Sequence, residues 1–175
     1  APLINEINRL KKEKDALILA HSYCSPEVIY GVADFCSDSY ALGLAAKNCT
    51  QKTIIFSGVK FMAETAKITS PDKLVYLPDQ EATCSLAESL DGKQLKKLKE
   101  QYPEHLVVCY INCSAEVKAL SDVCVTSSNV YNIVKKVESN KILFVPDSIM
   151  AENIRDHLKT EGIEFILSSY LISTP

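Results

Sequence analysis

The chain has 175 residues, 47% hydrophobic and 23% charged, a balance that excludes a disordered chain and a collagen-like repeat. Its 19 Lys and Arg against 22 Asp and Glu give a formal net charge of −3, which argues against a nucleic-acid-binding protein, because such proteins are usually basic. Apolar runs such as Ala16–Ala20 are far shorter than the roughly 20 residues of a membrane helix. No secretion signal is visible, so we expect a cytoplasmic protein.

The seven cysteines are spread along the chain, and no two are spaced as Cys-x-x-Cys. This odd number without a secretion signal predicts free thiols in a reducing compartment. Burial accounts for most of them, because free Cys is among the most buried residue types. The first residue is Ala, and Ser173–Pro175 follow an apolar run directly, so both ends look like cuts through a longer chain.

An internal repeat organises the sequence. Leu17–Val28 resembles Leu106–Val117, 89 residues later, and the tripeptide Met62–Glu64 recurs 88 residues later as Met150–Glu152. A repeat at nearly constant spacing indicates two similar structural units. Length also allows one domain or two small ones.

Each repeat predicts strands in alternation with helices. In the first copy the predicted strands are 16–21, 34–37, 53–57 and 74–77, and the helices are 27–33, 40–48 and 61–69. In the second copy the strands are 106–110, 123–126, 141–145 and 163–167, and the helices are 115–120, 128–138 and 148–160. Such alternation produces parallel sheets with helices on both faces. The predicted fold is therefore α/β, with two repeated three-layer α/β/α units and small four-stranded parallel sheets.

The repeat also predicts the domain organisation. We assign 1–100 to the first repeat with its N-terminal helix and 101–175 to the second repeat. The lysine-rich stretch 93–100 lies between the two, and its interleaved acidic residues favour a solvated helix face over a basic binding patch.

Polar side chains follow the first strand of each repeat. His21 and Tyr23 follow the strand of the first copy, and Tyr110 and Asn112 occupy the corresponding place in the second. Ligands of open α/β sheets bind at the carboxyl ends of the strands. His can carry a proton near neutral pH, and Tyr can stabilise a developing oxyanion. A strand-end His by itself is more often structural, but four such groups favour a binding site.

Two serines occupy equivalent places before helices. Ser39 follows the second strand of the first copy and Ser127 that of the second, and Asp38 or Ser39 is expected to cap the helix that follows. The exposed N–H groups of a helix N-terminus can hold a phosphate or carboxylate. For either serine taken singly, N-capping is the better interpretation. For the two serines together, an anion site and N-capping are about equally well supported.

Cys84 follows the fourth strand and is a candidate ligand or nucleophile, although a single Cys cannot hold a metal ion. Four other cysteines are related by the repeat, Cys24 to Cys113 and Cys36 to Cys124. Their repeated positions beside strands predict a packing role.

Taken together, these motifs resemble the quinolinate synthase family. The matching segments are His21–Tyr23, Pro26–Val28, Ala33–Phe35, Asp38–Ser39, Gly58–Val59, Phe61–Lys67, Leu77–Asp79, Cys84–Ala87, Tyr110–Asn112, Ser114–Lys118 and Cys124–Asn129. The resemblance covers about residues 5–150. It implies a transferase of NAD biosynthesis that condenses iminoaspartate with dihydroxyacetone phosphate to quinolinate. It also implies three α/β/α domains about a pseudo-threefold axis, with a central [4Fe–4S] cluster held by one Cys from each domain.

The resemblance implies a role for each candidate residue. His21 would hold the substrate at the reacting centre, and Tyr23 would assist dephosphorylation and proton transfer. The remaining substrate contacts would come from Ser39 and Ser127, which match anion-holding serines, and from Tyr110 and Asn112, which match a carboxylate-binding pair. Cys84 matches the first cluster ligand, and the open iron of such a cluster is a Lewis acid that polarises a C–O bond.

The sequence also departs from the family pattern. Leu171 stands where the family has its second cluster cysteine, Thr174 where it has His, and Ser148–Glu152 replaces a Gly-Lys-like loop. The third repeat is absent from this chain. One thiolate cannot hold a cluster whose irons each need a ligand, so we expect the isolated chain to hold no cluster and to be inactive.

Two other functions remain open at this point. One is a non-catalytic two-domain remnant that binds small anions or a protein partner and self-associates through the apolar face left by the missing domain. The other is an unrelated phosphate-sugar enzyme that uses Ser39 and Ser127 without iron.

Overall fold

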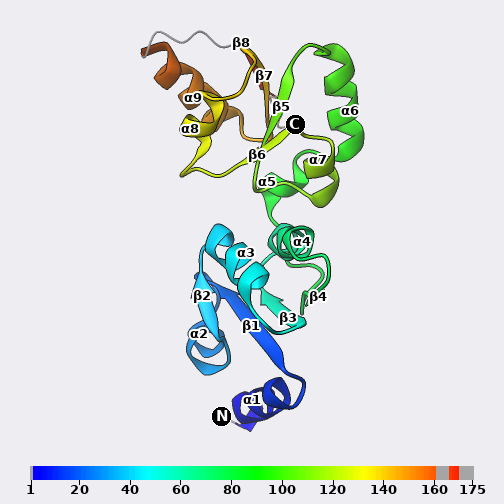
Figure 1. The fold of residues 1–175 in the computed structure, drawn as a ribbon, viewed down its shortest axis with the longest axis vertical. Coiled ribbons are helices and arrows are strands. Elements are labelled where there is room, and N and C mark those ends of the chain that lie inside the picture. The colour runs from blue at the N-terminus through cyan, green and yellow to red at the C-terminus, as the bar shows by residue number, and fades with distance from the viewer. Residues whose placement is uncertain (1, 161–165, 170–175) are drawn as a thin grey trace. The chain divides into compact units, whose positions relative to one another are not determined.

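The computed structural model describes residues 2–160 and 166–169 (Figure 1). The chain forms two compact units, Ala1–Thr83 and Cys84–Pro175. Each unit contains one four-stranded parallel sheet with helices against it, which confirms the predicted α/β class and the predicted number of strands. Within the described residues no helix combines the length and the apolar character needed to cross a membrane.

The first unit carries helices α1 to α4 and strands β1 to β4. Their bounds are α1 Pro2–Glu13, β1 Ala16–His21, α2 Pro26–Gly31, β2 Phe35–Ser37, α3 Ser39–Asn48, β3 Thr53–Ser57, α4 Lys60–Thr69 and β4 Leu74–Tyr76. The strand order is β2-β1-β3-β4. After β1 the chain moves to one side for β2 and returns to the other side for β3. The carboxyl ends of β1 and β3 therefore flank a topological switch point, the usual ligand position in such sheets.

The second unit repeats this order as β6-β5-β7-β8. Its elements are α5 Ser85–Glu88, α6 Gly92–Gln101, β5 Leu106–Tyr110, α7 Ala115–Ala119, β6 Val123–Val125, α8 Val130–Val134, β7 Lys141–Val145, α9 Ser148–Thr160 and β8 Ile166–Ser169. The switch point here lies between β5 and β7. The equal strand order of the two units confirms the internal repeat seen in the sequence.

Both faces of the second sheet are covered, which makes this unit a three-layer structure. On one face Val108, Ile142 and Phe144 pack against side chains of α8 and α9. On the other face Val107 and Leu143 pack against Leu90 and against side chains of α6 and α7. Alternate strand residues thus enter opposite cores, as expected for strands buried on both faces.

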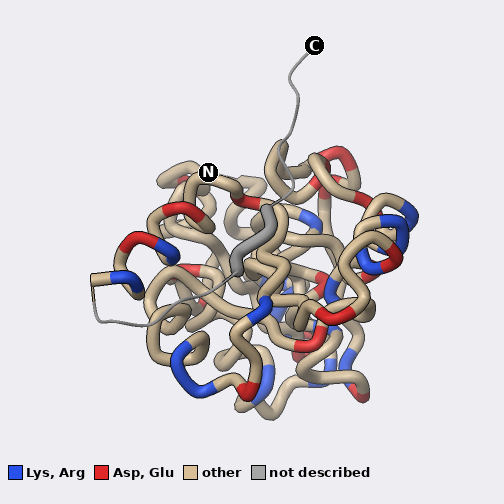
Figure 2. The backbone as a smooth tube through the Cα atoms, turned by 90° about the horizontal axis from the view of Figure 1, so that it is seen from above, with Lys and Arg blue, Asp and Glu red and all other residues tan. Residues whose placement is uncertain are grey.

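Helix α6 packs with the second unit, whereas the predicted division at residue 100 places it with the first. Leu95 is fully buried and Leu98 is 9% exposed, and both belong to the core beneath β5 and β7. The exposed face of the same helix carries Lys93, Lys96 and Lys97, so the predicted solvated face is confirmed. Figure 2 shows Lys and Arg segments interleaved with Asp and Glu segments along the backbone.

Two elements differ from the predicted ranges. Helix α8 spans Val130–Val134 instead of 128–138. It begins at Val130 because the Asn129 side chain accepts from the Thr126 N–H (2.7 Å) and forms a local turn before the helix. Such side-chain bonds compete with helix formation, and the β-branched residues of this segment are poor helix formers. Strand β8 is found at Ile166–Ser169, and residues 163–165 of its predicted range lie outside the described residues.

An aspartate anchors the central strand of each sheet in the same way. Asp34 accepts from the Ile18 N–H of β1 (2.8 Å) and donates its own N–H to the Ile18 carbonyl (2.8 Å). Asp122 makes the same pair of bonds with Val107 of β5, at 2.8 and 2.9 Å. The Ala-Asp and Ser-Asp dipeptides of the repeat thus hold β2 and β6 in register with their neighbours.

We expect the Asp122→Ala variant to lose roughly 1–3 kcal/mol of unfolding free energy, because the Val107 N–H loses its acceptor. Asp122→Asn keeps a side-chain carbonyl oxygen and is expected to lose less. Urea denaturation of the two variants beside the unchanged chain measures both values. An Asp122→Ala variant as stable as the unchanged chain contradicts this anchoring role.

Candidate functional site

His21 and Tyr23 form an aromatic pair at the switch point of the first sheet. His21 is the last residue of β1 and is half-buried, while Tyr23 lies in the turn that follows and is 56% exposed. Their ring centroids are 4.0 Å apart with 35° between the ring planes. The structure therefore brings together the two side chains that the sequence predicts for the reacting centre.

The surroundings of His21 keep its imidazole neutral. Burial lowers the pKa of His21 below its ordinary value, and the nearby Asp38 carboxylate offsets part of that effect. The Tyr23 N–H donates to Nδ1 of His21 (3.4 Å), so in the neutral ring Nε2 carries the proton. Nε2–H is thus a hydrogen-bond donor for a substrate oxygen at neutral pH.

The loop after β3 supports this pair from the other side of the switch point. The Tyr23 hydroxyl donates to Sδ of Met62 in α4 (3.7 Å), and the Cys24 thiol donates to the Ser57 carbonyl at the end of β3 (3.2 Å). A Cβ at Gly58 would lie 3.0 Å from the Phe56 ring, closer than ordinary contacts, so glycine allows the loop to pass over that ring. These contacts join the carboxyl ends of β1 and β3.

Asp38 caps α3, whereas the sequence left Asp38 and Ser39 as alternatives. One Asp38 carboxylate oxygen accepts from the N–H groups of Tyr40 and Ala41, both at 2.9 Å. Ser39 is the first residue of the helix and is half-buried. Its hydroxyl is therefore not the cap, although an anion beside it would also meet the Asp38 carboxylate. The anion-holding role of Ser39 stays a prediction.

In the second unit Tyr110 and Asn112 follow β5, as predicted. Tyr110 is the last residue of β5 and packs against the core that contains Val108 and Phe144. Asn112 is half-buried in the following turn, beside Ile111, whose N–H donates to the Val125 carbonyl of β6 (2.8 Å). Both side chains thus lie at the switch point of their own sheet, in the place that His21 and Tyr23 occupy in the first.

Ser127 is exposed and lines a cavity of about 300 Å³ at the carboxyl end of the second sheet. Asp147 and Asn153 line the same cavity, and Asp147 caps α9 by accepting from the Met150 N–H (2.8 Å). Helix α8 has five residues, so its dipole is smaller than the predicted longer helix would supply. Anion binding at Ser127 would have to overcome the Asp147 carboxylate, and it stays a prediction.

Cys84 is half-buried and stands directly before α5. The other position that bears on the predicted cluster, Leu171, lies outside the described residues, as does Thr174. Residues 2–160 and 166–169 contain no group of three or more His, Cys, Asp and Glu side chains arranged to hold a metal ion. A [4Fe–4S] cluster takes several thiolates, so the donor set of the described residues does not fit one.

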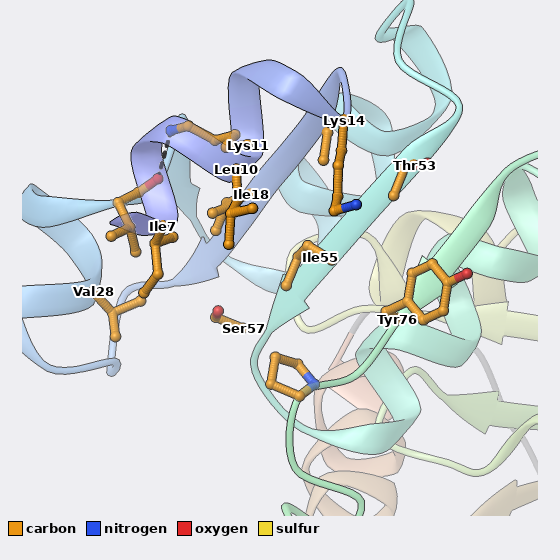
Figure 3. Close-up of a pocket in the computed structure, with 13 residues that line it drawn as sticks. Ile7, Leu10, Lys11, Lys14, Ile18, Val28, Thr53, Ile55, Ser57 and Tyr76 are labelled. Atoms are coloured by element: carbon orange, nitrogen blue, oxygen red, sulfur yellow. Dashed lines mark hydrogen bonds between the residues drawn. The ribbon is translucent and has the colours of Figure 1, made fainter. Parts of the chain in front are cut away.

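A separate cavity of about 860 Å³ lies on one face of the first sheet, beneath α1. Figure 3 shows Ile7 and Leu10 of α1 facing Ile18 of β1 and Ile55 of β3 across this space. Its described lining includes none of the predicted site residues. We therefore place the candidate site at the strand ends, where the chemistry-bearing side chains lie, and not in this apolar cavity.

The second unit fills the corresponding space. Val107 and Leu143 are the repeat counterparts of Ile18 and Ile55, and they pack against Leu90, which is 2% exposed. The position 88 residues before Leu90 is Pro2, which lies at the exposed start of α1.

The sequence analysis missed Cys109 as a chemically interesting residue. Cys109 is buried in β5 and lies in contact with two cysteines that were assigned to packing, Cys113 and Cys124. The signal was present in the repeat, because the counterpart of Cys109 in the first copy is Ala20. A cysteine at a position where the two repeats differ could therefore have been identified from the sequence as a candidate reactive residue.

Comparison with known proteins identifies the family. The sequence model of the family described as Quinolinate synthetase A protein matches residues 5–169. The chain is 53% identical over 161 residues to the quinolinate synthase of Clostridium kluyveri, covering 92% of this chain and 53% of that protein. It is 53% identical over 163 residues to that of Clostridium perfringens, covering 93% and 53%. For the quinolinate synthase of Sinorhizobium medicae the identity is 48% over 154 residues, covering 88% and 43%.

The matches extend the resemblance seen in the motifs to almost the whole chain. The chain spans about half the length of the curated relatives it matches. By the extent of the family match and the identity over nine-tenths of its residues, the chain belongs to the quinolinate synthase family.

Proposed function

We propose that this chain supplies about half of a quinolinate synthase, the part that binds substrate and transfers protons in the condensation of iminoaspartate with dihydroxyacetone phosphate. The observation that carries the proposal is the contact of the His21 and Tyr23 rings at a switch point, 4.0 Å apart. A neutral imidazole beside an exposed phenol is suited to binding an oxygen and moving a proton at neutral pH. The family match over residues 5–169 supports the assignment of the reaction.

Each predicted residue then has a defined chemical task. Nε2–H of His21 donates to a substrate oxygen, and the Tyr23 hydroxyl gives a proton to the departing phosphate or takes one from carbon. Hydroxyl groups of Ser39 and Ser127 donate to phosphate or carboxylate oxygens. Donors also come from Tyr110 and Asn112, whose places at the second switch point suit a carboxylate.

The iron–sulfur cluster of the family is not part of this assignment. Cys84 offers one thiolate, and the described residues supply no further set of ligands around it. We propose that the cluster's other ligands belong to the part of the relatives' sequence that lies beyond the family match at residues 5–169. The isolated chain, supplied anaerobically with iron and sulfide, is expected to develop no stoichiometric cluster absorption.

A hybrid enzyme tests the proposed function. Residues 5–169 of this chain, the part matched by the family model, replace the corresponding segment of the Clostridium kluyveri quinolinate synthase, with which the chain shares 53% identity. The hybrid is expected to form quinolinate from iminoaspartate and dihydroxyacetone phosphate under anaerobic conditions. A folded hybrid that carries its cluster and forms no quinolinate overturns the proposal.

One observation favours a second candidate, a non-catalytic protein that binds small anions or a partner. The apolar cavity beneath α1 is the space that Leu90 fills in the second unit, so a partner side chain could fill it in the first. Light scattering of the isolated chain measures the self-association that this candidate predicts. An inactive hybrid together with a self-associating chain would support this candidate over the enzyme. A cytoplasmic location is part of both proposals.

A further inference from the structure

Three cysteine side chains gather at the edge of the second sheet. Cys109 of β5 and Cys124 of β6 are direct partners in the register of the two parallel strands. The Cys109 thiol is in hydrogen-bond contact with the thiols of Cys124 and Cys113, the latter from the turn after β5. We call Cys109, Cys113 and Cys124 the thiol cluster.

The thiol cluster is open to solvent at one end. Cys109 and Cys113 are buried in the core beneath α6 and α7, whereas Cys124 is exposed on β6, the edge strand of its sheet. A small solute that reaches the cluster therefore meets Cys124 first. Two further thiols lie directly behind it.

The contacts within the cluster favour one thiolate. Hydrogen bonds from the Cys113 and Cys124 thiols lower the pKa of Cys109 well below its usual range, and the Lys118 ammonium acts in the same direction. The same contacts raise the pKa values of Cys113 and Cys124, because these two groups keep their protons as donors. The thiolate, not the thiol, is the reactive form of cysteine.

The first unit provides an internal comparison. Cys24 and Cys36 stand at the positions of Cys113 and Cys124, but Ala20 replaces the central Cys109. Burial raises the pKa of Cys24, and its thiol donates to the Ser57 carbonyl. The first unit therefore has thiols at the two flanking positions and no sulfur at the central one.

We propose that the thiol cluster is a peroxide-sensitive site in which Cys124 and Cys109 are converted to a disulfide. The Cys109 thiolate attacks one oxygen of hydrogen peroxide. The O–O bond breaks, Cys109 becomes a sulfenic acid, and the other oxygen leaves as hydroxide. The Cys124 thiol then loses its proton, and its sulfur displaces the second hydroxide as the S–S bond forms. Two thiols lose two electrons in total, and one peroxide is reduced to two water molecules.

The register of the two strands brings the Cα atoms of Cys109 and Cys124 into the range that a disulfide spans. Neighbouring strands of a sheet lie about 4.7–4.9 Å apart. Disulfides span Cα distances of about 4.4–6.8 Å, so paired residues of adjacent strands meet this requirement. Cys109 and Cys124 share a face because they are register partners, so no strand has to shift.

Peptide mapping of the peroxide-treated chain tests the proposal. Trypsin cuts after Lys99, Lys118 and Lys135, which puts Cys109 and Cys113 in one peptide and Cys124 in another. The expected product is these two peptides joined by a disulfide that dithiothreitol releases. In the same sample Cys24 and Cys36 are expected to remain alkylatable thiols.

Two variants make the result specific. Cys109→Ala copies the arrangement of the first unit and is expected to lose the cross-linked pair completely, and Cys124→Ser changes only an exposed side chain and is expected to do the same. Circular dichroism checks that both variants keep the fold. A link within the peptide that holds Cys109 and Cys113, or accumulation of Cys109 as a sulfinic acid without a link, overturns the proposal. So does a cross-link that survives in Cys109→Ala.

Discussion

The Phe144→Ala variant is expected to lose roughly 3–5 kcal/mol of unfolding free energy, the range measured for large-to-small changes of buried aromatic residues. Phe144 has no exposed surface and lies in β7 at the centre of the core formed with α8 and α9. Alanine would leave a cavity between the sheet and both helices. Because total stabilities of single domains are about 5–15 kcal/mol, the second unit would lose a large share of its stability.

Hydrogen exchange and urea denaturation measure this loss. Amide protection in β5 and β7 reports on the second unit, while protection in β1 and β3 reports on the first. Ile149→Ala is the matched control, because Ile149 is 71% exposed at the start of α9 and its change is expected to stay within about 0.5 kcal/mol. A Phe144→Ala loss no larger than that of the control would contradict the packing described for this core.

In the active hybrid enzyme, Tyr23→Phe is expected to lower kcat by roughly 10²–10⁴-fold, the contribution of a well-placed general acid or base. Phenylalanine keeps the ring contact with His21, whose centroid lies 4.0 Å away, and removes only the hydroxyl that carries the proton. KM is expected to change little, because the assigned binding contacts belong to other side chains. Steady-state kinetics of quinolinate formation separates the two constants.

Tyr30→Phe is the control for this variant, since it removes the same hydroxyl from a side chain that is 87% exposed on α2. It is expected to leave kcat and KM unchanged. If Tyr23→Phe retains the kcat of the hybrid, Tyr23 is not the proton-transfer residue, although the family assignment and the binding roles of the other residues would stand.

Much of the fold could be predicted from the sequence, because strands and helices follow the local pattern of apolar and polar residues. Short apolar runs bounded by polar turns predicted β1, β3, β5 and β7 at the ranges where the structure has them. Each element was predicted in both copies of the repeat, so an element with a weak sequence pattern in one copy was supported by its counterpart in the other. The predicted strands also placed four candidate site residues at strand ends, because a residue after a parallel strand lies at the carboxyl edge of the sheet. These residues are His21, Tyr23, Tyr110 and Asn112.

The sequence did not predict which of several neighbouring side chains hydrogen-bonds to the backbone at a helix start. Asp38 and Ser39 are both good caps by residue type, and only the backbone geometry selects Asp38, whose carboxylate reaches two N–H groups. Asn129 delays the start of α8 to Val130 through one side-chain bond to the Thr126 N–H, which helix propensities do not include. In both cases the three-dimensional position of the hydrogen-bond partner decides.

The sequence by itself determined the family, the α/β class, the two units and the residue types at the strand ends, because repeats and hydrophobic periods are properties of the chain order. Only the tertiary structure decided which side chains meet across that order. It buries Lys73, which is 6% exposed and donates to the Ala46 carbonyl (2.7 Å), and it packs α6 on the second sheet. It also brings Cys109 and Cys124 together although 15 residues separate them. Contacts of this kind depend on the order of the strands in the sheet. That order is decided by how whole helices and strands pack together, which local sequence patterns do not specify.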